Sequence, residues 1–490
     1  MLWVSAVSEI ALRCENLRYR YQPNEAPVFE NISLTVKKGE TVLLMGPSGC
    51  GKSTLAYCLA GLYPEYAGSL EGNIEAFGEN LQAMNPAQRA RKISIMFQNP
   101  DNQFCMSNAE HEVLFALENI NFQGNFHQRL VDLLNPSGLL ELKSEPIHTL
   151  SGGTKQKIAL ATAQAVEAKV LILDEPFANI DPAACTQLAA RLAELNRAGI
   201  TLIIVDHRLD YWRPFLSRVL LMDNNGRLLN DGILPRDLDQ NKTLFESLGL
   251  FYGDEWLEQI TPPIVLSPRE SIVEASNLSA YYGKKPFLSE LNFSIEKGSI
   301  TALVGSNGSG KSTLLGAIAG LVKHKGKLKV SGQVGLVFQN PRFQFLTLKV
   351  RTEVEMTLQV SEPLKNAAEI RAAADDMLAR FGLANYAEVS PYELSQGQQR
   401  RLAIISMLAG QKELLLLDEP TYAQDEQATS FIMRLLAEKV EQGLSAVIAT
   451  HDLALVRRCA NHILLLADGK LHELLPAQFE EYAAEVLRAS

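Results

Sequence analysis

The sequence contains the same nine-residue pattern twice. GPSGCGKST occupies residues 46–54, and GSNGSGKST occupies residues 305–313. Both fit G-x-x-x-x-G-K-[ST], and each lies between a short apolar run and a helix-compatible segment. The glycines let the backbone turn tightly and direct N–H groups inward, so that the loop and the next helix N-terminus can hold a polyphosphate. Two such loops predict two nucleotide-binding α/β domains in one chain.

Six further blocks recur in the same order in both halves, which indicates a duplicated domain rather than a short-period repeat. The matched pairs include NLRYRY (16–21) with NLSAYY (277–282), FENISLTVKKGE (29–40) with LSELNFSIEKGS (288–299), IMFQNPDNQF (95–104) with LVFQNPRFQF (336–345), LSGGTKQKIAL (150–160) with LSQGQQRRLAI (394–404), LILDEP (171–176) with LLLDEP (415–420), and IIVDHRLD (203–210) with VIATHDLA (447–454). The expected domains are 9–244 and 269–490, joined by a proline-containing linker at 245–268.

The spacing of the blocks places a deletion in the second copy. The two loop lysines are 259 residues apart, whereas the two DEP glutamates are 244 residues apart. The second copy is therefore shorter after its glycine-rich loop, and most of the loss is expected before the FQNP block. Buried apolar runs that end in acidic or polar residues, such as VLILDE and TLIIVDH, predict a parallel sheet in each copy.

Composition narrows the functional class. The chain has 490 residues and a formal net charge of −10, which argues against a general nucleic-acid binder. The six cysteines form no C-x-x-C pair, which argues against zinc or iron–sulfur sites and fits a reducing compartment. The N-terminal segment lacks a basic region typical of a signal peptide, and no apolar run reaches the roughly 18 residues of a membrane helix. A membrane role would therefore need a membrane-spanning partner.

Residues of the two loops are expected to bind phosphate and Mg²⁺. Lys52 would reach the β- and γ-phosphates, and Ser53 would place its hydroxyl on Mg²⁺. The loop residues expected at the nucleotide are Gly46, Ser48, Gly49, Gly51, Lys52, Ser53 and Thr54 in the first copy, and Gly305, Asn307, Gly308, Gly310, Lys311, Ser312 and Thr313 in the second.

Acidic pairs follow a buried strand in both copies. Asp174 and Asp418 can hold Mg²⁺, and Glu175 and Glu419 can act as general base on water. An acidic pair after a strand is also a common helix N-cap, but its repetition downstream of a phosphate loop favours catalysis.

Three further polar motifs recur. His207 and His451 follow the next strand and can contact the γ-phosphate, and Gln98 and Gln339 can bind Mg²⁺. LSGGT and LSQGQ open predicted helices and form a second anion site from Ser151, Gly152 and Gly153, and from Ser395, Gln396, Gly397 and Gln398.

Together these motifs resemble the ATPase subunits of ATP-binding-cassette (ABC) transporters, with two nucleotide-binding domains fused in tandem. The resemblance implies a P-loop fold in each domain, with a mostly parallel sheet core, an antiparallel β subdomain and a helical subdomain. It implies ATP and Mg²⁺ as cofactors, with ATP held head to tail between the loop of one domain and the signature of the other. It assigns Tyr21 and Tyr282 to adenine stacking, in preference to Tyr19 and Tyr281, and Ala178–Asp181 and Ala423–Asp425 to the D-loops. Its metal ligands are Ser53, Gln98, Asp174, Ser312, Gln339 and Asp418.

The FQNPDNQF and FQNPRFQF stretches resemble the ATPases of energy-coupling-factor importers, which take up vitamins or transition-metal ions. This resemblance implies an integral membrane coupling protein and a substrate-binding membrane subunit as partners, and a peripheral position at the cytoplasmic face of the cell membrane. Phe104, Met106, Phe343 and Phe345 are the expected docking side chains, with core filling as the other interpretation. A soluble tandem-cassette ATPase acting on ribosomes or nucleic acid is the alternative, and a non-hydrolytic scaffold is a weaker one.

Two departures from the repeat predict unequal sites. Cys50 stands where the second copy has Ser309, which predicts a thiol-sensitive first loop. Gln396 stands where the first copy has Gly152, so the second signature is expected to be weakened but not lost.

Overall fold

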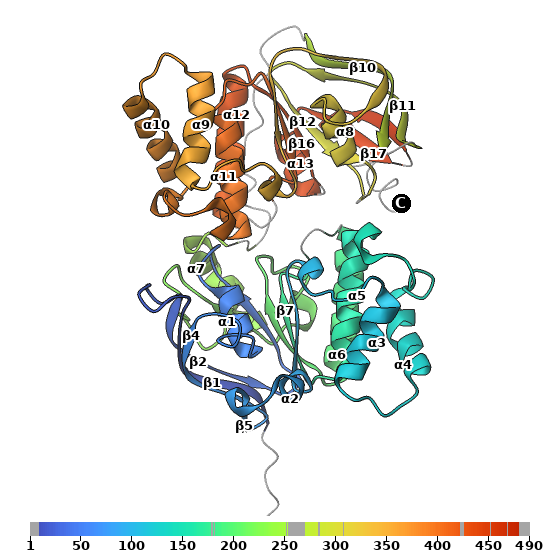
Figure 1. Ribbon diagram of the computed structural model, residues 1–490, viewed down its shortest axis with the longest axis vertical. Helices are drawn as coiled ribbons and strands as arrows, with labels where there is room; N and C mark the ends of the chain where they lie inside the picture. The colour runs from blue at the N-terminus through green and yellow to red at the C-terminus, as the bar shows by residue number, and fades with distance from the viewer. Residues whose placement is uncertain are drawn as a thin grey trace, which may run out of the picture. The chain divides into compact units, whose positions relative to one another are not determined.

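The computed structural model divides the chain into two compact units, residues 1–253 and 254–490, which we describe separately (Figure 1). We call them the first unit and the second unit. The structure describes residues 9–177, 180, 182–250, 252, 270–282, 285–306, 308–421, 426–450, 452–467 and 469–479.

A five-stranded parallel sheet forms the core of the first unit, in the order β6-β7-β8-β3-β9. Its strands are β3 (Thr41–Met45), β6 (Ile93–Met96), β7 (Val170–Asp174), β8 (Thr201–Val205) and β9 (Arg218–Leu221). Every residue of β3, β7 and β8 is buried, because a parallel sheet is covered on both faces. Their apolar runs reflect this burial.

Two subdomains flank this core. An antiparallel sheet, ordered β2-β1-β4-β5, contains β1 (Ile10–Arg20), β2 (Phe29–Lys37), β4 (Ser69–Ala76) and β5 (Glu79–Asn80). The helices of the unit are α1 (Lys52–Leu59), α2 (Pro86–Ala90), α3 (Ala109–Asn119), α4 (Phe126–Leu134), α5 (Gly152–Ala165), α6 (Pro182–Arg197) and α7 (Lys242–Ser247). Helices α3, α4 and α5 share a hydrophobic core of their own and form a helical subdomain (Figure 1).

The second unit repeats this plan. Its main sheet has the order β14-β15-β16-β12-β17-β18 and is parallel except for the β17–β18 pair. Its strands are β12 (Ile300–Val304), β14 (Val334–Val337), β15 (Leu414–Asp418), β16 (Ser445–Ala449), β17 (His462–Ala467) and β18 (Lys470–Leu474). An antiparallel sheet, ordered β11-β10-β13, contains β10 (Ser271–Tyr282), β11 (Lys285–Glu296) and β13 (His324–Val330).

The described residues of the second unit form six helices, the first five of which correspond in order to α1, α3, α4, α5 and α6 of the first unit. They are α8 (Lys311–Ile318), α9 (Val350–Ser361), α10 (Ala367–Arg380), α11 (Gln396–Leu408), α12 (Glu426–Glu441) and α13 (Leu453–Cys459). The predicted α/β fold, with a parallel core, an antiparallel subdomain and a helical subdomain, is confirmed in both units. In the part of the chain that the structure describes, no helix combines the length and apolar character that crossing a bilayer requires.

The predicted deletion also has a structural counterpart. Between α1 and β6 the first unit contains β4, β5 and α2. Between α8 and β14, where the structure describes every residue, the second unit contains only β13. The loss therefore trims the edge of the antiparallel subdomain and leaves the core strands intact.

Candidate active site

The glycine-rich loop of each unit connects a buried core strand to a helix. Gly51 and Gly310 are the N-caps of α1 and α8, with φ angles of 104° and 109° that disfavour other residues. A Cβ at Gly46 would lie 2.6 Å from the Met222 carbonyl oxygen, and one at Gly305 would lie 2.5 Å from that of Leu466. These positions leave no room for a side chain.

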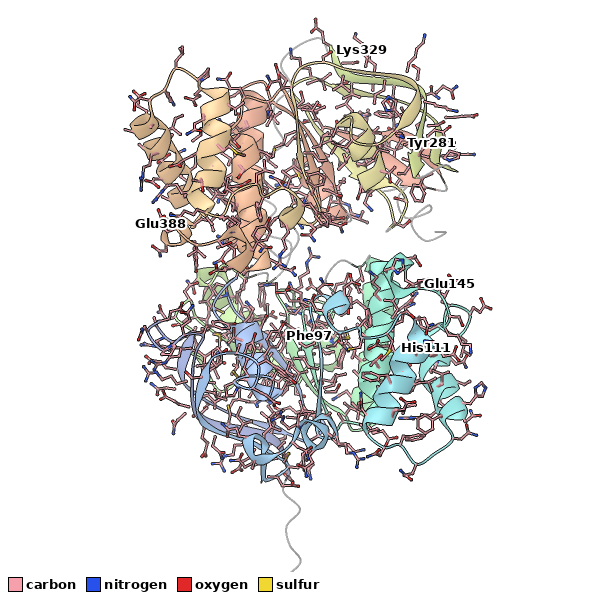
Figure 2. The ribbon with its side chains drawn as sticks, viewed as in Figure 1. Phe97, His111, Glu145, Tyr281, Lys329 and Glu388 are labelled. Carbon is pink, nitrogen blue, oxygen red and sulfur yellow. The ribbon has the colours of Figure 1, made fainter. Side chains whose placement is uncertain are left out.

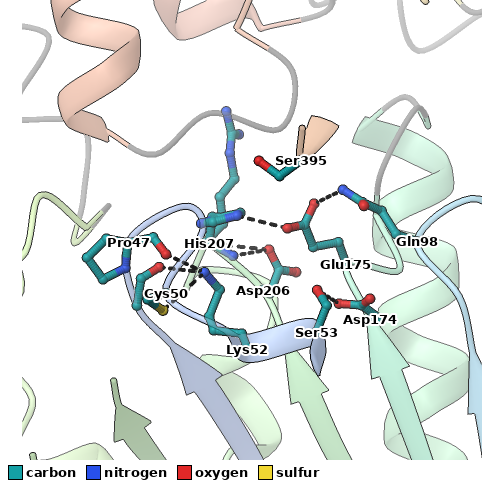
Figure 3. Close-up of polar contacts among 12 residues, drawn as sticks. Pro47, Cys50, Lys52, Ser53, Gln98, Asp174, Glu175, Asp206, His207 and Ser395 are labelled. Carbon is teal, nitrogen blue, oxygen red and sulfur yellow. Dashed lines mark hydrogen bonds and ion pairs between the residues drawn. The ribbon is translucent and has the colours of Figure 1, made fainter. Parts of the chain in front are cut away.

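The loop lysines fold back over their own loops. Lys52 is buried, and its Nζ donates to the carbonyl oxygens of Gly46 and Pro47, at 2.8 Å each (Figure 3). Lys311 donates to the Gly305 and Ser306 carbonyl oxygens at 2.8 and 3.0 Å. The same motif thus places an ammonium group at the loop of each unit.

Asp174 lies at the end of β7, next to the first loop. Its Oδ1 accepts a hydrogen bond from Ser53 Oγ at 2.9 Å, and its Oδ2 accepts one from Tyr57 OH at 2.9 Å. Burial and the neighbouring Glu175 charge raise the pKa of Asp174 to about 7. Burial likewise raises the pKa of Asp418 in the second unit, and a hydrogen bond from Ser312 opposes that rise.

Glu175 brings together two of the other predicted side chains. Its Oε1 lies 2.8 Å from His207 Nε2, and its Oε2 accepts a hydrogen bond from Gln98 Nε2 (Figure 3). Burial acts to raise the pKa of Glu175, but His207, Lys52 and Gln98 hold it below its ordinary value. The carboxylate is therefore ionised and can accept a proton.

The backbone at the predicted general base is alike in both units. Glu175 has a φ of 44° and Glu419 a φ of 50°, a region that few non-glycine residues adopt. The Glu175 N–H donates to the Val205 carbonyl oxygen at 2.8 Å, and the Glu419 N–H donates to that of Ala449 at 2.9 Å. This bond fixes the start of the loop after each acidic strand.

Two side chains in the first unit, buried Asp206 and partly buried Tyr57, escaped the sequence prediction. Asp206 Oδ1 accepts from the backbone N–H of His207 at 2.6 Å and of Arg208 at 3.1 Å, and its Oδ2 accepts from Trp212 Nε1 at 2.9 Å. The sequence feature that could have drawn attention to Asp206 is its alignment with Thr450, a position where the two copies differ.

Tyr57 is the second residue that the sequence prediction missed. Its alignment with Gly316 is the difference between the copies that could have revealed it. The Tyr57 hydroxyl bonds to Asp174, and its ring packs edge-to-face against that of Phe97, which precedes Gln98, with centroids 5.6 Å apart. Phe97 is labelled in Figure 2. Tyr57 thus connects α1 to both the acidic strand end and the FQNP segment.

The signature motifs begin helices, as predicted. Ser151 caps α5 by accepting from the Thr154 N–H, and Ser395 caps α11 by accepting from the Gln398 N–H. In the second unit the Gln398 side chain also accepts from the Ser395 N–H at 2.9 Å. Gly152 and Gly153, and Gln396 and Gly397, form the first turns of these helices, and helix N-termini commonly bind anions.

The aromatic residues proposed for adenine differ in exposure. Tyr21 is 45% exposed, and its hydroxyl lies 2.9 Å from Thr54 Oγ1. Tyr19 is buried and donates to the Ala67 carbonyl oxygen at 3.0 Å. In the second unit Tyr281 lies on β10 (Figure 2). Exposure favours Tyr21 over Tyr19, whose ring fills the core.

Several predicted features lie outside the described residues. They are Asn307, His451, the side chain of Tyr282, most of the two D-loop segments, and most of the linker 245–268.

The expected docking side chains are not equivalent. Phe345 is only 6% exposed, and Phe104 packs against two hydrophobic clusters of the first unit. Phe343, by contrast, is 78% exposed. Phe345 therefore fills the core, as the second interpretation expected. Phe343 is exposed and can contact a partner.

The thiol expectation also needs correction. Cys50 is buried, and burial raises the pKa of its thiol, so both accessibility and thiolate content are low. Of the six cysteines, all of them described, only Cys105 is exposed. Thiol reagents are expected to react first at Cys105.

Comparison with known proteins assigns the family. The family model described as "ABC transporter" matches residues 29–178 and 288–422. The chain belongs to the ABC transporter family. It is 35% identical to "Putative HMP/thiamine import ATP-binding protein YkoD" of Bacillus subtilis, across 95% of this chain and 92% of the relative. It is 32% identical to a "Putative ABC transporter ATP-binding protein" of Methanosarcina acetivorans, across 94% of this chain and 85% of that protein.

Solved structures support the tandem fold. A chain titled "RNase-L Inhibitor" matches with a TM-score of 0.62 and 19% identity, covering 96% of this chain and 93% of that chain. A "Model of ribosome-bound archaeal Pelota and ABCE1" matches with a TM-score of 0.68 and 20% identity, covering 97% of this chain and 80% of that one. At this identity the likeness concerns the fold.

Members of the ABC family are ATPases that use ATP with Mg²⁺, and the residues of both units fit that pair. The loop N–H groups and the lysine ammonium suit a polyphosphate. In the first unit a serine hydroxyl and an aspartate carboxylate, 2.9 Å apart, are oxygen ligands of the kind Mg²⁺ prefers. In the second unit the buried Ser309 Oγ has no hydrogen-bond partner within the described residues and lies in the loop itself.

Proposed function

We propose that the chain is the ATP-hydrolysing motor subunit of a membrane importer of the energy-coupling-factor type. Its cargo would be a vitamin or a transition-metal ion, taken up through an integral membrane coupling protein and a substrate-binding membrane subunit. The chain would act at the cytoplasmic face of the membrane. The name of the Bacillus subtilis relative, which refers to HMP/thiamine import, supports this proposal.

The observation that carries the proposal is an exposed apolar loop in the second unit. Phe343, Leu346 and Leu348 are 78%, 75% and 80% exposed. They follow Gln339 closely in sequence, so a partner that covers them would sit beside the proposed γ-phosphate sensor. Burying three such side chains would contribute about 1.5–3 kcal/mol each, which favours an apolar partner segment.

A buried carboxylate holds this loop in place. Glu353 accepts hydrogen bonds from the N–H groups of Leu346 and Thr347, at 3.1 and 2.9 Å, and from Thr347 Oγ1 at 2.9 Å. Glu112 makes the matching bonds to the Cys105 and Met106 N–H groups at 2.9 and 2.7 Å. The exposed side chains are therefore presented on a fixed backbone, which suits recognition.

The proposed reaction is attack of water on the γ-phosphate of ATP, which breaks the bond between the γ-phosphorus and the β–γ bridging oxygen and releases ADP and inorganic phosphate. Glu175 accepts the proton of the water, and His207 and Gln98 hold the Glu175 carboxylate in position. Lys52 stabilises charge on the phosphates. Mg²⁺ held by Ser53 and Asp174 would neutralise the charge that develops in the transition state. The matched residues of the second unit would perform the same steps.

We further propose that each site forms between the two units, with the domain limits 9–244 and 269–490. One site would combine Lys52, Ser53, Gln98, Asp174, Glu175 and His207 with Ser395, Gln396, Gly397 and Gln398. The other would combine Lys311, Ser312, Gln339, Asp418, Glu419 and His451 with Ser151, Gly152 and Gly153.

Co-purification from detergent-solubilised membranes tests the function. Wild-type chain is expected to retain integral membrane proteins, and Phe343→Asp with Leu348→Asp should lose them while ATP binding survives. Leu364→Asp is a matched control, because Leu364 is also fully exposed in the second unit but lies outside this loop. Co-sedimentation with ribosomes that the double substitution does not change would contradict the importer and favour the soluble alternative.

A further inference from the structure

Helix α11 carries a buried arginine that α5 lacks. Arg400 is 2% exposed. Its Nη1 donates to the Phe338 and Asp418 carbonyl oxygens at 2.9 and 3.1 Å, and its Nη2 donates to the Gln339 carbonyl oxygen. One guanidinium thus connects the signature helix, the end of the acidic strand and the start of the segment 339–345. We call this segment, and its equivalent 98–104, the glutamine loop.

The first unit has Gln156 at the matched position. Gln156 is as buried as Arg400, but its Nε2 reaches only the Gln98 carbonyl oxygen, at 3.5 Å. Its Oε1 is buried and has no hydrogen-bond partner in the described part of the chain. A single long contact therefore replaces three bonds from a charged group.

A neighbouring pair of contacts differs in the same direction. Gln344 Nε2 donates to the Ala403 carbonyl oxygen of α11 at 2.8 Å, and this bond is buried. The equivalent bond of the first unit, from Gln103 to the Ala159 carbonyl oxygen of α5, is 3.5 Å long. In the middle of the loop the order is reversed: Lys155 Nζ of α5 lies 2.8 Å from Asp101 Oδ1, whereas the matched contact of the second unit, from Arg342 Nε to Gln399 Oε1, is 3.3 Å long. The Asp101 carboxylate is 54% exposed, so water weakens that ion pair. The buried bonds at both ends of the loop are therefore what join it more tightly to the signature helix in the second unit.

We propose that Arg400 is a positioning residue that fixes the glutamine loop of the second unit to its signature helix. A guanidinium presents its donors in a rigid planar fork, and hydrogen bonds from a charged donor are stronger than neutral ones. Any displacement of the loop away from α11 would leave this buried charge short of acceptors, which is costly. The backbone around Gln339 is therefore held in place before nucleotide binds.

The consequence is a mechanical difference between the units. Ser395 caps the helix that holds Arg400, so in the second unit the signature and the glutamine loop move as one body. In the first unit the loop is joined to α5 by two long contacts and one partly exposed ion pair, so it is expected to move more readily relative to that helix. The functional meaning of this difference rests on the proposed role of Gln339, but the difference in anchoring does not.

Hydrogen exchange of the two glutamine loops tests the proposal. Amides of residues 339–345 are expected to exchange at least about tenfold more slowly than those of 98–104 in the wild-type chain, as one to two charge-assisted bonds imply. Arg400→Gln, which installs the residue of the first unit, should remove the difference. Arg400→Lys, which keeps the charge but loses the fork, should give intermediate exchange.

Arg401→Gln is the matched control. Arg401 is the next residue of α11, but its Nη1 donates to the Phe381 carbonyl oxygen, away from the glutamine loop. It should leave exchange of 339–345 unchanged. In Arg400→Gln the kcat should fall more than the KM changes, because nucleotide still binds while Gln339 is less well placed.

Gln156→Arg keeps the test decisive if Arg400→Gln fails to fold. It should slow exchange of 98–104. Unchanged exchange of 339–345 in folded Arg400→Gln, or of 98–104 in Gln156→Arg, would overturn the proposal. Loss of the membrane partner would instead contradict the proposed function and leave the anchoring untouched.

Discussion

In the first unit a phenol supports the carboxylate that is proposed to bind metal, and in the second unit a guanidinium supports the backbone around the matched carboxylate. Tyr57 donates to Asp174, whereas the matched residue is Gly316. Arg400 donates to the carbonyl oxygens of Gln339 and Asp418, whereas the matched residue is Gln156. The residues proposed to bind Mg²⁺ and to activate water are the same types in both units, whereas the glycine-rich loops and signatures differ at positions such as Ser48/Asn307 and Gly152/Gln396. The duplicated domains have therefore diverged in what surrounds and supports the shared residues.

A second difference lies on the surface. The positions of Phe343, Leu346 and Leu348 correspond to Asn102, Cys105 and Ser107 in the first unit. The second unit therefore offers an apolar loop and the first a polar one. If a partner has two docking segments, we expect its more apolar segment to bind the loop of the second unit and its more polar segment to bind the loop of the first.

Removing the proposed general bases should have the largest effect. The double substitution Glu175→Gln and Glu419→Gln should lower ATP hydrolysis by about 10²- to 10⁴-fold, as loss of general base catalysis implies. Each single substitution should leave a different residual rate, because the sites are unequally supported. Steady-state phosphate release measures this.

Glu141→Gln serves as the control, since Glu141 is exposed. Equal residual rates of ATP hydrolysis in the two single variants would contradict the inference that the two sites are unequal. Full activity in the double variant would contradict the catalytic role of both glutamates.

The two phenylalanines of FQNPRFQF should separate stability from recognition. Phe345→Ala should lower the free energy of unfolding by about 3–5 kcal/mol, because it empties a core site. Phe343→Ala should change it by less than about 0.5 kcal/mol, because the side chain is exposed. Denaturant unfolding of the full chain measures both. A large loss of stability in Phe343→Ala would contradict the assignment of the exposed loop.

Tyr57→Phe should weaken metal binding in the first unit only. The hydroxyl donates to a buried carboxylate, a bond worth about 1.5–3 kcal/mol, so the affinity for Mn²⁺ with ATP should fall by roughly 10- to 150-fold if the bond is fully felt. Electron paramagnetic resonance can follow Mn²⁺ in a Lys311→Ala background, which silences the second loop. Tyr211→Phe is the control, because its hydroxyl bonds to Cys185. Unchanged affinity would show that Tyr57 only fills space.

The pH dependence of metal binding should be the smallest of these effects. Burial raises the folded-state pKa of Asp174 to about 7, so below pH 7 a proton competes with the metal for this carboxylate. Affinity at the first loop should be about tenfold weaker at pH 6 than at pH 8, and nearly constant above pH 8. The same shift means that Asp174 contributes to stability at low pH and that this contribution is lost as pH rises from about 4 to 7. A flat affinity between pH 6 and 8 would contradict the assignment.

The sequence was enough to predict which of the proposed catalytic side chains would meet in the first unit. Gln98, Glu175 and His207 each follow a core strand, and the ends of parallel strands share one edge of the sheet. The anchoring by Arg400 was not predictable, because its acceptors are backbone carbonyls whose positions depend on the packing of α11 against the sheet. Tyr57 was missed because its partner, the Asp174 carboxylate, lies 117 residues away in the sequence. Only the folded chain brings the two side chains together.

The docking side chains were predicted only in part. Phe343 is the last residue of the short turn Pro341–Phe343, and Phe345 lies two residues after it. No helical or strand periodicity in this stretch indicates which of the two side chains points inward. Phe343 points to solvent and Phe345 into the core. Only the three-dimensional path of this turn separates them.

The number of ATP molecules bound per chain tests the central claim most directly. With Mg²⁺ present and hydrolysis blocked by Glu175→Gln and Glu419→Gln, equilibrium binding of radiolabelled ATP should saturate at two per chain with two distinct dissociation constants. Tyr57→Phe should weaken one of them and leave the other unchanged. Saturation at one ATP per chain, or two identical sites that both respond to Tyr57→Phe, would contradict the account.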